Sequence, residues 1–252
     1  LLILSGDVPG LSAATVERLH QACSDRNAPL AVLTFTPDDP TGYGRIVRDG
    51  KKLVRIVEHK DATKAEKEIT EINSGVYLFH TALLRPAVLS LRSDNAQGEF
   101  YLTDIVALAR AREFECAVVK APAAELMGVD SRSVLAEAEA VWQTQRRIQA
   151  MDEGATLLDP DSVWFSHDTV LGTDVTLGPN IFFGPGVSVA DNAEVRAFSH
   201  LEGVRIEKGA IVGPFARLRP GAVIGKDAFV GNFVEIKNAV LGDGAKASHL
   251  SY

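Results

Sequence analysis

An aliphatic or aromatic residue returns at every sixth position between Leu171 and Ala245, and glycine often follows it. These positions are Leu171, Leu177, Phe183, Val189, Val195 and Leu201, then Ile206, Val212, Leu218, Ile224, Val230 and Ile236. The fourth residue after them is also small or aliphatic: Val175, Ile181, Val187, Ala193 and Ser199, then Ala210, Ala216, Ala222, Ala228 and Val234. A period of six fits neither a helix face nor an alternating strand, and hexapeptide repeats indicate a parallel β-helix.

The repeat predicts a left-handed parallel β-helix over residues 156–252, in which each hexapeptide forms one side of a triangular coil. We expect glycine, or Gly-Pro, Gly-Asp and Asp-Asn pairs, to form the corners, where a positive φ must be tolerated. The register slips by one residue from Leu201 to Ile206 and again from Ile236 to Leu241, and such slips are expected to bend or loop the coil. A β-solenoid with another cross-section is the alternative.

Residues 1–130 follow a different pattern and predict an α/β domain. The apolar run at 1–4 reads as a buried parallel strand, Ser12 can cap a helix to about Cys23, and 30–36 reads as the next strand. Asp49-Gly50 separates two further strands as a hairpin turn. Ligands of such folds bind beyond the carboxyl ends of the parallel strands, where we expect Asp7.

A helix is predicted between the two domains. Its apolar and small side chains fall at helical spacing, and 131–155 is therefore interpreted as a linking helix. Alternatively, this helix belongs to the first domain.

Charge and cysteine usage narrow the class of protein. The 252 residues carry a formal net charge of -7, which provides no basic field for nucleic acid. No apolar run reaches the roughly 18 residues that span a bilayer, and no leader precedes a cleavage site, so we expect no membrane insertion and a cytoplasmic protein. Cys23 and Cys116 have no ligand spacing and are expected to be buried as small apolar side chains.

Some polar residues carry two interpretations each. Asp7 can hold Mg²⁺ beside phosphates or cap the next helix. Asn73 offers donors and acceptors for a sugar, but asparagine at a strand edge is often only a turn residue. His249 can be an ordinary surface histidine or a general base.

Several segments resemble the bifunctional bacterial enzymes that make UDP-N-acetylglucosamine, in which glucosamine-1-phosphate N-acetyltransferase is joined to N-acetylglucosamine-1-phosphate uridyltransferase. The first domain carries Gly6-Asp7-Val8-Pro9, Thr41-Gly42-Tyr43-Gly44-Arg45, Val57-Glu58-His59-Lys60-Asp61, Ile72-Asn73-Ser74-Gly75 and Gln97-Gly98-Glu99-Phe100-Tyr101-Leu102-Thr103-Asp104. The repeat domain carries Gly213-Pro214-Phe215-Ala216-Arg217-Leu218-Arg219-Pro220, Gly231-Asn232-Phe233-Val234-Glu235-Ile236-Lys237 and Ala247-Ser248-His249-Leu250-Ser251-Tyr252.

For the first domain the resemblance implies a Rossmann-like nucleotidyltransferase fold and uridylyl transfer from UTP to N-acetylglucosamine-1-phosphate, with Mg²⁺ and release of pyrophosphate. Asp7 and Asp130 would hold the metal, and Gly44, Glu58 and Asn73 would contact the nucleotide sugar. The family commonly has asparagine at the place of Asp130 and tyrosine at that of Ser5. Its glycine-rich triphosphate loop is expected before Leu1, so that this domain is partial.

For the repeat domain the resemblance implies acetyl transfer from acetyl-CoA to glucosamine-1-phosphate. His249 would be the general base, Arg219 and Lys237 would hold the sugar phosphate, and Tyr252 would contact the sugar. The coils that bind acetyl-CoA are expected after Tyr252. The family resemblance also implies a homotrimer with active sites between subunits, and a role in precursor supply for peptidoglycan and lipopolysaccharide.

Two other functional classes are weighed against this one. A nucleotidyltransferase with a purely structural or regulatory β-helix would not need the set of Arg219, Lys237 and His249. A γ-type carbonic anhydrase would hold zinc with three histidines, but His167, His200 and His249 lack the short spacing of that family.

Overall fold

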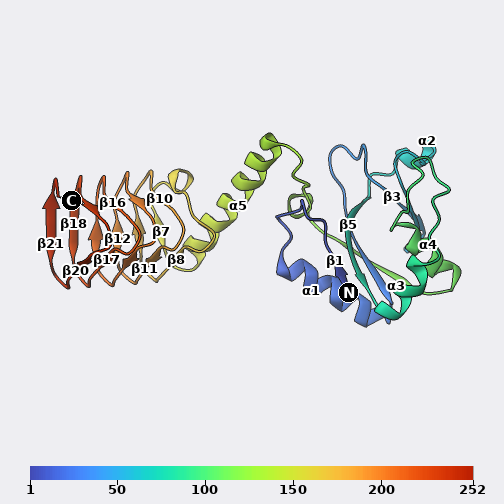
Figure 1. Cartoon of the computed structure of the whole chain (residues 1–252), viewed down its shortest axis with the longest axis horizontal. Helices are drawn as coiled ribbons and strands as arrows, with labels where there is room; N and C mark the ends of the chain where they lie inside the picture. The colour runs from blue at the N-terminus through green and yellow to red at the C-terminus, as the bar shows by residue number, and fades with distance from the viewer. Residues whose placement is uncertain (252) are drawn as a thin grey trace. The chain divides into compact units, whose positions relative to one another are not determined.

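A computed structural model of the chain describes residues 1–251 (Figure 1). It divides into two compact units, Leu1–Ala138 and Glu139–Tyr252. The division falls inside the segment 131–155 that the sequence predicts as a link between domains. Within residues 1–251, none of the helices has both the length and the hydropathy that a bilayer crossing requires.

The first unit is built on one mixed sheet. Its strands run in the order β4-β3-β5-β2-β6, with β1 paired to β5. β2 and β6 are parallel, whereas β1, β2 and β3 all pair antiparallel with β5. The strands are β1 (Leu2–Ile3), β2 (Leu30–Phe35), β3 (Arg45–Asp49), β4 (Lys52–Val57), β5 (Ile72–Phe79) and β6 (Cys116–Lys120).

Helices cover both faces of this sheet. Leu30 and Val32 of β2 pack in one cluster with α3 and α4, whereas Ala31, Leu33 and Phe35 pack in another with Leu19 of α1. Because both faces of β2 are covered, its run of apolar residues does not alternate with polar ones. The helices are α1 (Ala13–Arg26), α2 (Lys64–Lys67), α3 (Thr81–Val88), α4 (Asp104–Ala111) and the short 3₁₀ helix η1 (Ala123–Glu125).

The start of the chain differs from its prediction. The run 1–4 was expected to be a buried parallel strand, but only Leu2–Ile3 forms β1, and it pairs antiparallel with β5. Leu1 and Leu4 are 59% and 52% exposed, although the Phe79 amide of β5 donates to the Leu1 carbonyl at 2.8 Å. By contrast, Ser12 caps α1 as predicted, since its side chain accepts a hydrogen bond from the Thr15 amide at 3.1 Å.

The cysteine prediction is confirmed for one of the two residues. Cys116 is buried on β6, and burial raises the pKa of its thiol to about 11, so it stays protonated and inert. Cys23 on α1 is only half-buried.

Helix α5 (Arg132–Asp152) ends as part of the second unit. The Gln143 side chain is buried, donates to the Phe165 carbonyl at 2.7 Å and accepts from the Phe165 amide at 2.9 Å. The side-chain amide of Gln143 thus bonds both the N–H and the C=O of Phe165, as the backbone of a neighbouring strand would. The second half of α5 therefore covers the open end of the coil.

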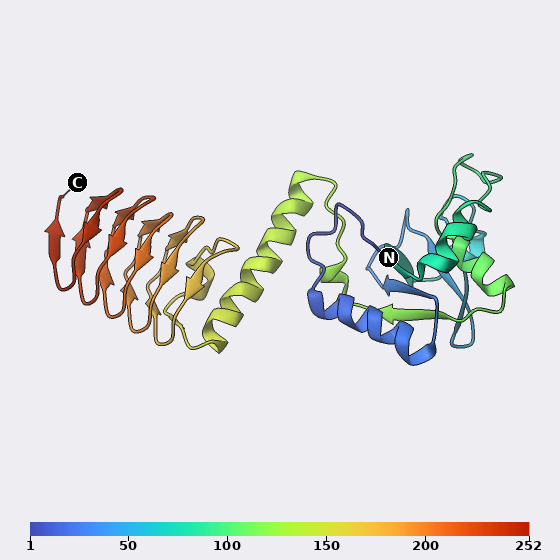
Figure 2. The ribbon, with the colours of Figure 1, turned by 60° about the horizontal axis from the view of Figure 1, so that its bottom comes forward.

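The second unit confirms the predicted left-handed parallel β-helix. Short parallel strands form three sheets, one on each side of the coil (Figures 1 and 2). In chain order they are β7 (Thr156–Leu157), β8 (Val170–Leu171), β9 (Thr176–Leu177), β10 (Phe182–Phe183), β11 (Ser188–Val189), β12 (Glu194–Val195), β13 (His200–Leu201), β14 (Arg205–Ile206), β15 (Ile211–Val212), β16 (Arg217–Leu218), β17 (Val223–Ile224), β18 (Phe229–Asn232), β19 (Glu235–Ile236), β20 (Val240–Leu241) and β21 (Lys246–His249).

The predicted inward positions fill the interior of this coil. All of them are buried except Leu171 and Ile236, which are half-buried but pack against the same cluster. The predicted series did not include Val204, which lies on a side that is one residue short, or Leu157, Val163 and Phe165 of the first coil, which are buried in the same cluster.

The two register slips do not bend or loop the coil. Ser188 pairs with Val170, eighteen residues before it, and with Arg205, seventeen residues after it. The missing residue is absorbed at one corner, where Gly203 adopts a φ of 56° and Asn238 a φ of 45°. Successive coils stay in register because the strands on either side of this corner still pair.

The glycine that follows each aliphatic position has another role than predicted. Most corners take their positive φ from a residue other than glycine, such as Asp174 or Asn180, and the predicted Asp-Asn pair does so at Asn192. Gly178 and Gly231 are instead needed for close packing of coils: an added Cβ would lie 2.7 Å from the Ala197 amide nitrogen and 1.6 Å from the Ser248 carbonyl oxygen.

Replacing Ile224 by aspartate should unfold the β-helix. Ile224 is fully buried among aliphatic side chains, and an unpaired carboxylate there would cost several kcal/mol. Thermal unfolding followed by circular dichroism measures this loss. The control is Val223→Asp, which places the same group on the outward side of the same strand, β17. Equal stability of the two variants would show that the inward register is wrong.

Candidate functional site

Two segments that each carry an exposed carboxylate meet beyond the carboxyl end of β1. The Val129 amide donates to the Asp7 carbonyl at 2.8 Å, and a Cβ added at Gly128 would lie 3.5 Å from Asp7 Oδ2. This pairing brings the segment of Asp7 next to that of Asp130, which comes 123 positions later in the sequence. The side chains of Asp7 and Asp130 are both exposed.

The alternative role of Asp7 as a helix cap is wrong, because Ser12 caps α1. Within residues 1–251 no three His, Cys, Asp or Glu side chains gather as a metal cluster. Mg²⁺, however, is often held by one or two carboxylates together with substrate phosphates. The pair of Asp7 and Asp130 fits that chemistry, and aspartate in place of asparagine adds a negative charge to it.

A second group of predicted residues surrounds Gly44. The backbone amide of Asn73 donates to the Gly44 carbonyl at 2.8 Å. A Cβ added at Gly44 would lie 3.4 Å from both carboxylate oxygens of Glu58. The structure therefore brings residues 44, 58 and 73 together. A larger residue at position 44 would crowd Glu58, so glycine keeps this carboxylate accessible to a ligand.

Thr103 and Ser5 also belong to this region. Thr103 is buried and donates its hydroxyl to Glu58 Oε1 at 2.9 Å, which fixes the carboxylate. Ser5 Oγ donates to the Ser74 carbonyl at 3.3 Å and thus contacts the residue of β5 that follows Asn73. In the sequence, Thr103 is part of the motif at 97–104, but nothing in that motif indicates a contact with Glu58. Because Asp7 follows Ser5 by two residues, the short segment after β1 connects both groups.

Arg45 is the residue that sequence reasoning missed. It is 1% exposed, donates to the Tyr43 carbonyl, and places a guanidinium nitrogen 3.3 Å from His59 Nδ1. Since arginine only donates, Nδ1 must accept, and the His59 proton lies on Nε2. Arg45 therefore ties the turn before β3 to the residues after β4, which include Glu58.

In the second unit, Arg219 and Lys237 lie near one another around Glu235. Arg219 pairs with Glu235 at 2.8 Å. The hydrogen bond from Arg219 holds the pKa of Glu235 below its ordinary value, and the charges of Arg217 and Lys237 lower it further. These residues form a cationic edge next to the corner of Pro220 and Asn238.

His249 lies at a different corner of the same coil region. It ends β21, is exposed, and is the register partner of Asn232. Within residues 1–251 the hydrogen bonds and ion pairs join His249 to neither Arg219 nor Lys237. Tyr252, the fourth residue predicted for this site, lies outside the described residues. The three histidines of the alternative zinc site likewise form no group within residues 1–251.

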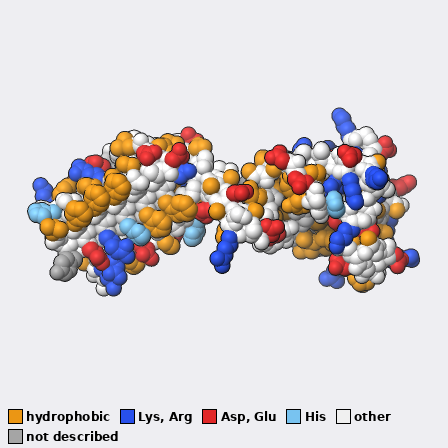
Figure 3. Space-filling model, turned by 90° about the horizontal axis from the view of Figure 1, so that it is seen from above, with side chains coloured by type: hydrophobic (Ala, Val, Ile, Leu, Met, Phe, Trp, Pro, Cys, Tyr) orange, Lys and Arg blue, Asp and Glu red, His pale blue; other side chains and the backbone are white. Residues whose placement is uncertain are grey.

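A ladder of aromatic side chains occupies the corner beside His249. The rings of Phe198 and Phe215 stack at 5.0 Å, and those of Phe215 and Phe233 at 5.1 Å. About half of each side chain is exposed, and Figure 3 shows bands of hydrophobic side chains on the surface of the β-helix. All three residues have a φ between 56° and 59°, which bulky residues seldom adopt.

Comparisons with known proteins agree with both units. Residues 203–238 match the family model described as bacterial transferase hexapeptide (six repeats). The "Bifunctional protein GlmU" of Sphingopyxis alaskensis is 53% identical over 253 aligned positions, and that of Paramagnetospirillum magneticum is 49% identical over 253. Each alignment covers 100% of this chain and 56% of the relative. The protein of the same name from Gluconobacter oxydans is 51% identical, over 99% of this chain and 56% of the relative.

The chain thus spans about half the length of the curated relatives that it matches. The identity extends over the sheet unit and the β-helix alike, since the alignments cover the chain from end to end. Over its whole length the chain is therefore similar to the bifunctional GlmU proteins.

Proposed function

We propose that this chain carries parts of two active sites that together make UDP-N-acetylglucosamine, a precursor for peptidoglycan and lipopolysaccharide. One site transfers an acetyl group from acetyl-CoA to glucosamine-1-phosphate, and the other transfers a uridylyl group from UTP to N-acetylglucosamine-1-phosphate. The observation that supports this most is that the residues expected for uridylyl transfer gather in the sheet unit. GlmU-named relatives that align with all of the chain support it as well.

In the sheet unit, Asp7 and Asp130 would hold Mg²⁺, which offsets negative charge on the phosphates. Glu58, fixed by Thr103, is placed to accept hydrogen bonds from the sugar. The side-chain amide of Asn73 can donate as well as accept. Gly44 leaves room for the sugar beside Glu58. The sugar phosphate then attacks the α-phosphate of UTP, and pyrophosphate leaves. Positioning and charge stabilisation supply most of the catalysis in such transfers.

In the β-helix, His249 would take a proton from the glucosamine amine as it attacks the thioester. Histidine is the side chain whose reference pKa lies nearest to neutral pH, which suits a general base. Arg219 and Lys237 would hold the sugar phosphate, with Glu235 fixing the direction of Arg219. Tyr252 would contact the sugar.

We further propose that the β-helix forms a homotrimer and that a neighbouring subunit completes the acetyl-transfer site. The exposed ladder of Phe198, Phe215 and Phe233 beside His249 supports this, because aromatic side chains are enriched at protein interfaces.

A cytoplasmic location fits the free thiols of Cys23 and Cys116.

Separate assays of the two half-reactions test the proposal in the protein that contains this chain. Pyrophosphate release from UTP with N-acetylglucosamine-1-phosphate measures the first, and thiol release from acetyl-CoA with glucosamine-1-phosphate measures the second. Both activities are expected. Uridylyl transfer without acetyl transfer would favour the alternative of a purely structural or regulatory β-helix.

Thr103→Val should lower kcat/KM for uridylyl transfer about tenfold or more. Valine keeps the shape but removes the hydroxyl that binds Glu58, and hydrogen bonds to charged groups contribute about 1.5–3 kcal/mol. Thr103→Ser retains the hydroxyl and is the matched control. If both variants behaved alike, the hydrogen bond would not position Glu58.

A further inference from the structure

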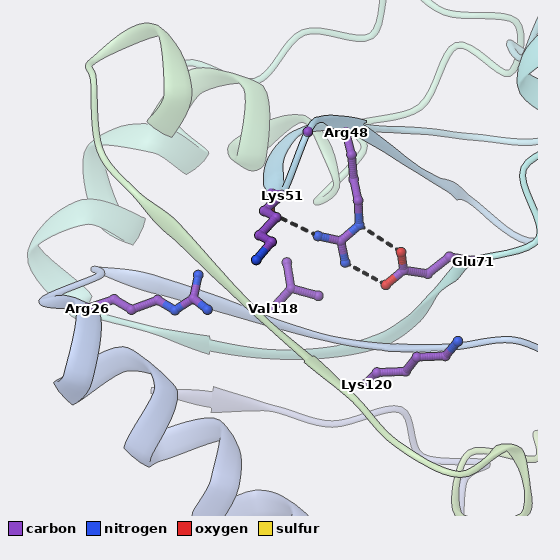
Figure 4. A pocket seen from close by; sticks show the side chains of 7 residues that line it. Arg26, Arg48, Lys51, Glu71, Val118 and Lys120 are labelled. Atoms are coloured by element: carbon purple, nitrogen blue, oxygen red, sulfur yellow. Dashed lines mark hydrogen bonds and ion pairs between the residues drawn. The ribbon is translucent and has the colours of Figure 1, made fainter.

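The sheet unit contains a second group of charged residues, which the proposed reactions do not use. It lines an open cavity of about 420 Å³ (Figure 4). The lining side chains come from the end of α1, from β3, from the turn between β3 and β4, from the residue before β5 and from β6: Arg26, Arg48, Lys51, Glu71, Val118 and Lys120. None of them belongs to the group around Asp7 or the group around Gly44.

Glu71 is the one carboxylate of this lining, and Arg48 neutralises it. Arg48 Nε and Nη2 donate to the two oxygens of Glu71 at 2.8 and 2.7 Å, as Figure 4 shows, and Thr34 donates a third hydrogen bond at 2.7 Å. Burial alone would raise the pKa of Glu71, but the bonds from Arg48 and Thr34 hold it below the ordinary value. Glu71 thus stays ionised, and its acceptor capacity is committed to these two residues.

The other three cations have weak ion-pair partners or none among residues 1–251. Arg26 approaches Glu115 only to 3.7 Å with both side chains about half exposed, and such a surface pair contributes little. Among residues 1–251, the ion pairs include neither Lys51 nor Lys120. Four cationic side chains and one carboxylate line the cavity, which gives it an excess of three positive charges in a chain whose net charge is -7.

The lining is also held in place before any ligand arrives. Arg48 Nη1 donates to the Lys51 carbonyl at 3.2 Å, so the ion pair with Glu71 also fixes the β3–β4 turn that carries Lys51. Val118 and Lys120 lie on β6, which pairs with the buried strand β2. A fixed lining lowers the entropy that a ligand must overcome when it binds.

We propose that this cavity binds a small, multiply charged phosphate compound, such as pyrophosphate, tripolyphosphate or the phosphate chain of a nucleotide. Guanidinium and ammonium groups form strong charge-assisted hydrogen bonds with phosphate oxygens. A ligand with about three negative charges matches the unbalanced cations, and the volume falls within the range of about 300–1,000 Å³ of small-ligand sites. The bound anion removes the mutual repulsion of Arg26, Lys51 and Lys120.

Isothermal titration calorimetry on the whole chain tests this site, at low ionic strength and with a chelator that keeps Mg²⁺ from the carboxylate pair. Tripolyphosphate should bind, and Lys51→Glu and Lys120→Glu should each weaken binding at least about tenfold, the loss expected for one charged hydrogen bond. The matched control is Lys52→Glu, the next residue of the same hairpin but outside the cavity, which should leave the affinity within about twofold.

Parallel titrations with pyrophosphate and UTP identify the source of the phosphate. UTP binding more tightly than tripolyphosphate would show that the base contributes, and equal or weaker binding would assign the site to the phosphate chain alone. The milder variant Lys51→Gln guards against misfolding of the charge reversals. The proposal is overturned if no phosphate compound binds, or if Lys51→Gln and Lys51→Glu bind as well as Lys52→Glu. The outcome is independent of the proposed function, because neither half-reaction is measured.

Discussion

Replacing His249 by alanine in the protein that contains this chain should lower the turnover of acetyl transfer by about 100-fold or more. General-base catalysis typically contributes about 10² to 10⁴ in rate, and alanine has no group that can accept the amine proton. Uridylyl transfer should be unchanged, because Asp7, Glu58 and Asn73 lie in the other unit. Thiol release from acetyl-CoA and pyrophosphate release from UTP, measured on the same preparation, give the two rates.

The matched control for this variant is His167→Ala, which removes another exposed histidine from the β-helix. It should leave both rates unchanged. An equal loss of both activities in His249→Ala would point to misfolding, and retention of acetyl transfer would remove His249 from the reaction.

Asp7→Ala should abolish Mg²⁺-dependent uridylyl transfer and leave acetyl transfer intact. The exposed carboxylate of Asp7 lies on the segment that meets the segment of Asp130 beyond β1, and without it Asp130 alone would hold the metal. The activity is measured by pyrophosphate release over a series of Mg²⁺ concentrations. Asp130→Asn, by contrast, should retain activity, because an asparagine oxygen can also bind Mg²⁺.

Asp25→Ala provides the control, since this aspartate is exposed and lies near the C-terminal end of α1, whereas Asp7 precedes the helix. Uridylyl transfer that persists in Asp7→Ala at every Mg²⁺ concentration would show that Asp7 is not a metal ligand.

The interior of the β-helix could be predicted from sequence because one environment returns with each repeat. Ile224, for example, fills the same kind of position as Ile206 one coil earlier, and both are buried. The corners could not be predicted in this way. Glycine is required both where φ is positive and where two backbones come close, and only the distance between coils separates these causes, as at Gly231.

The candidate sites were predictable where a motif names the residue. Local pattern does not show that the segment of Asp7 meets the segment of Asp130, because the backbone bond between Val129 and Asp7 depends on how the whole sheet is connected. The burial of Arg45 could not be predicted, because arginine is seldom fully buried without a charged partner and the neighbouring sequence offers none. The position of His249, away from Arg219, follows from the coil geometry and could not be seen in the motifs that contain these residues.

The short corner of the β-helix shows where this protein tolerates changes in length. Gly203 donates to the Pro185 carbonyl at 2.8 Å and accepts from the Gly221 amide at 3.0 Å, while Asn238 donates to the Pro220 carbonyl at 3.2 Å. Corners with and without the extra residue therefore stack on one another at this edge. Deletion of a residue here leaves the inward series on both flanking sides unchanged, whereas a deletion within a side would turn its apolar residues outward. Single-residue gaps between relatives should thus accumulate at this edge, and longer differences should come as whole coils.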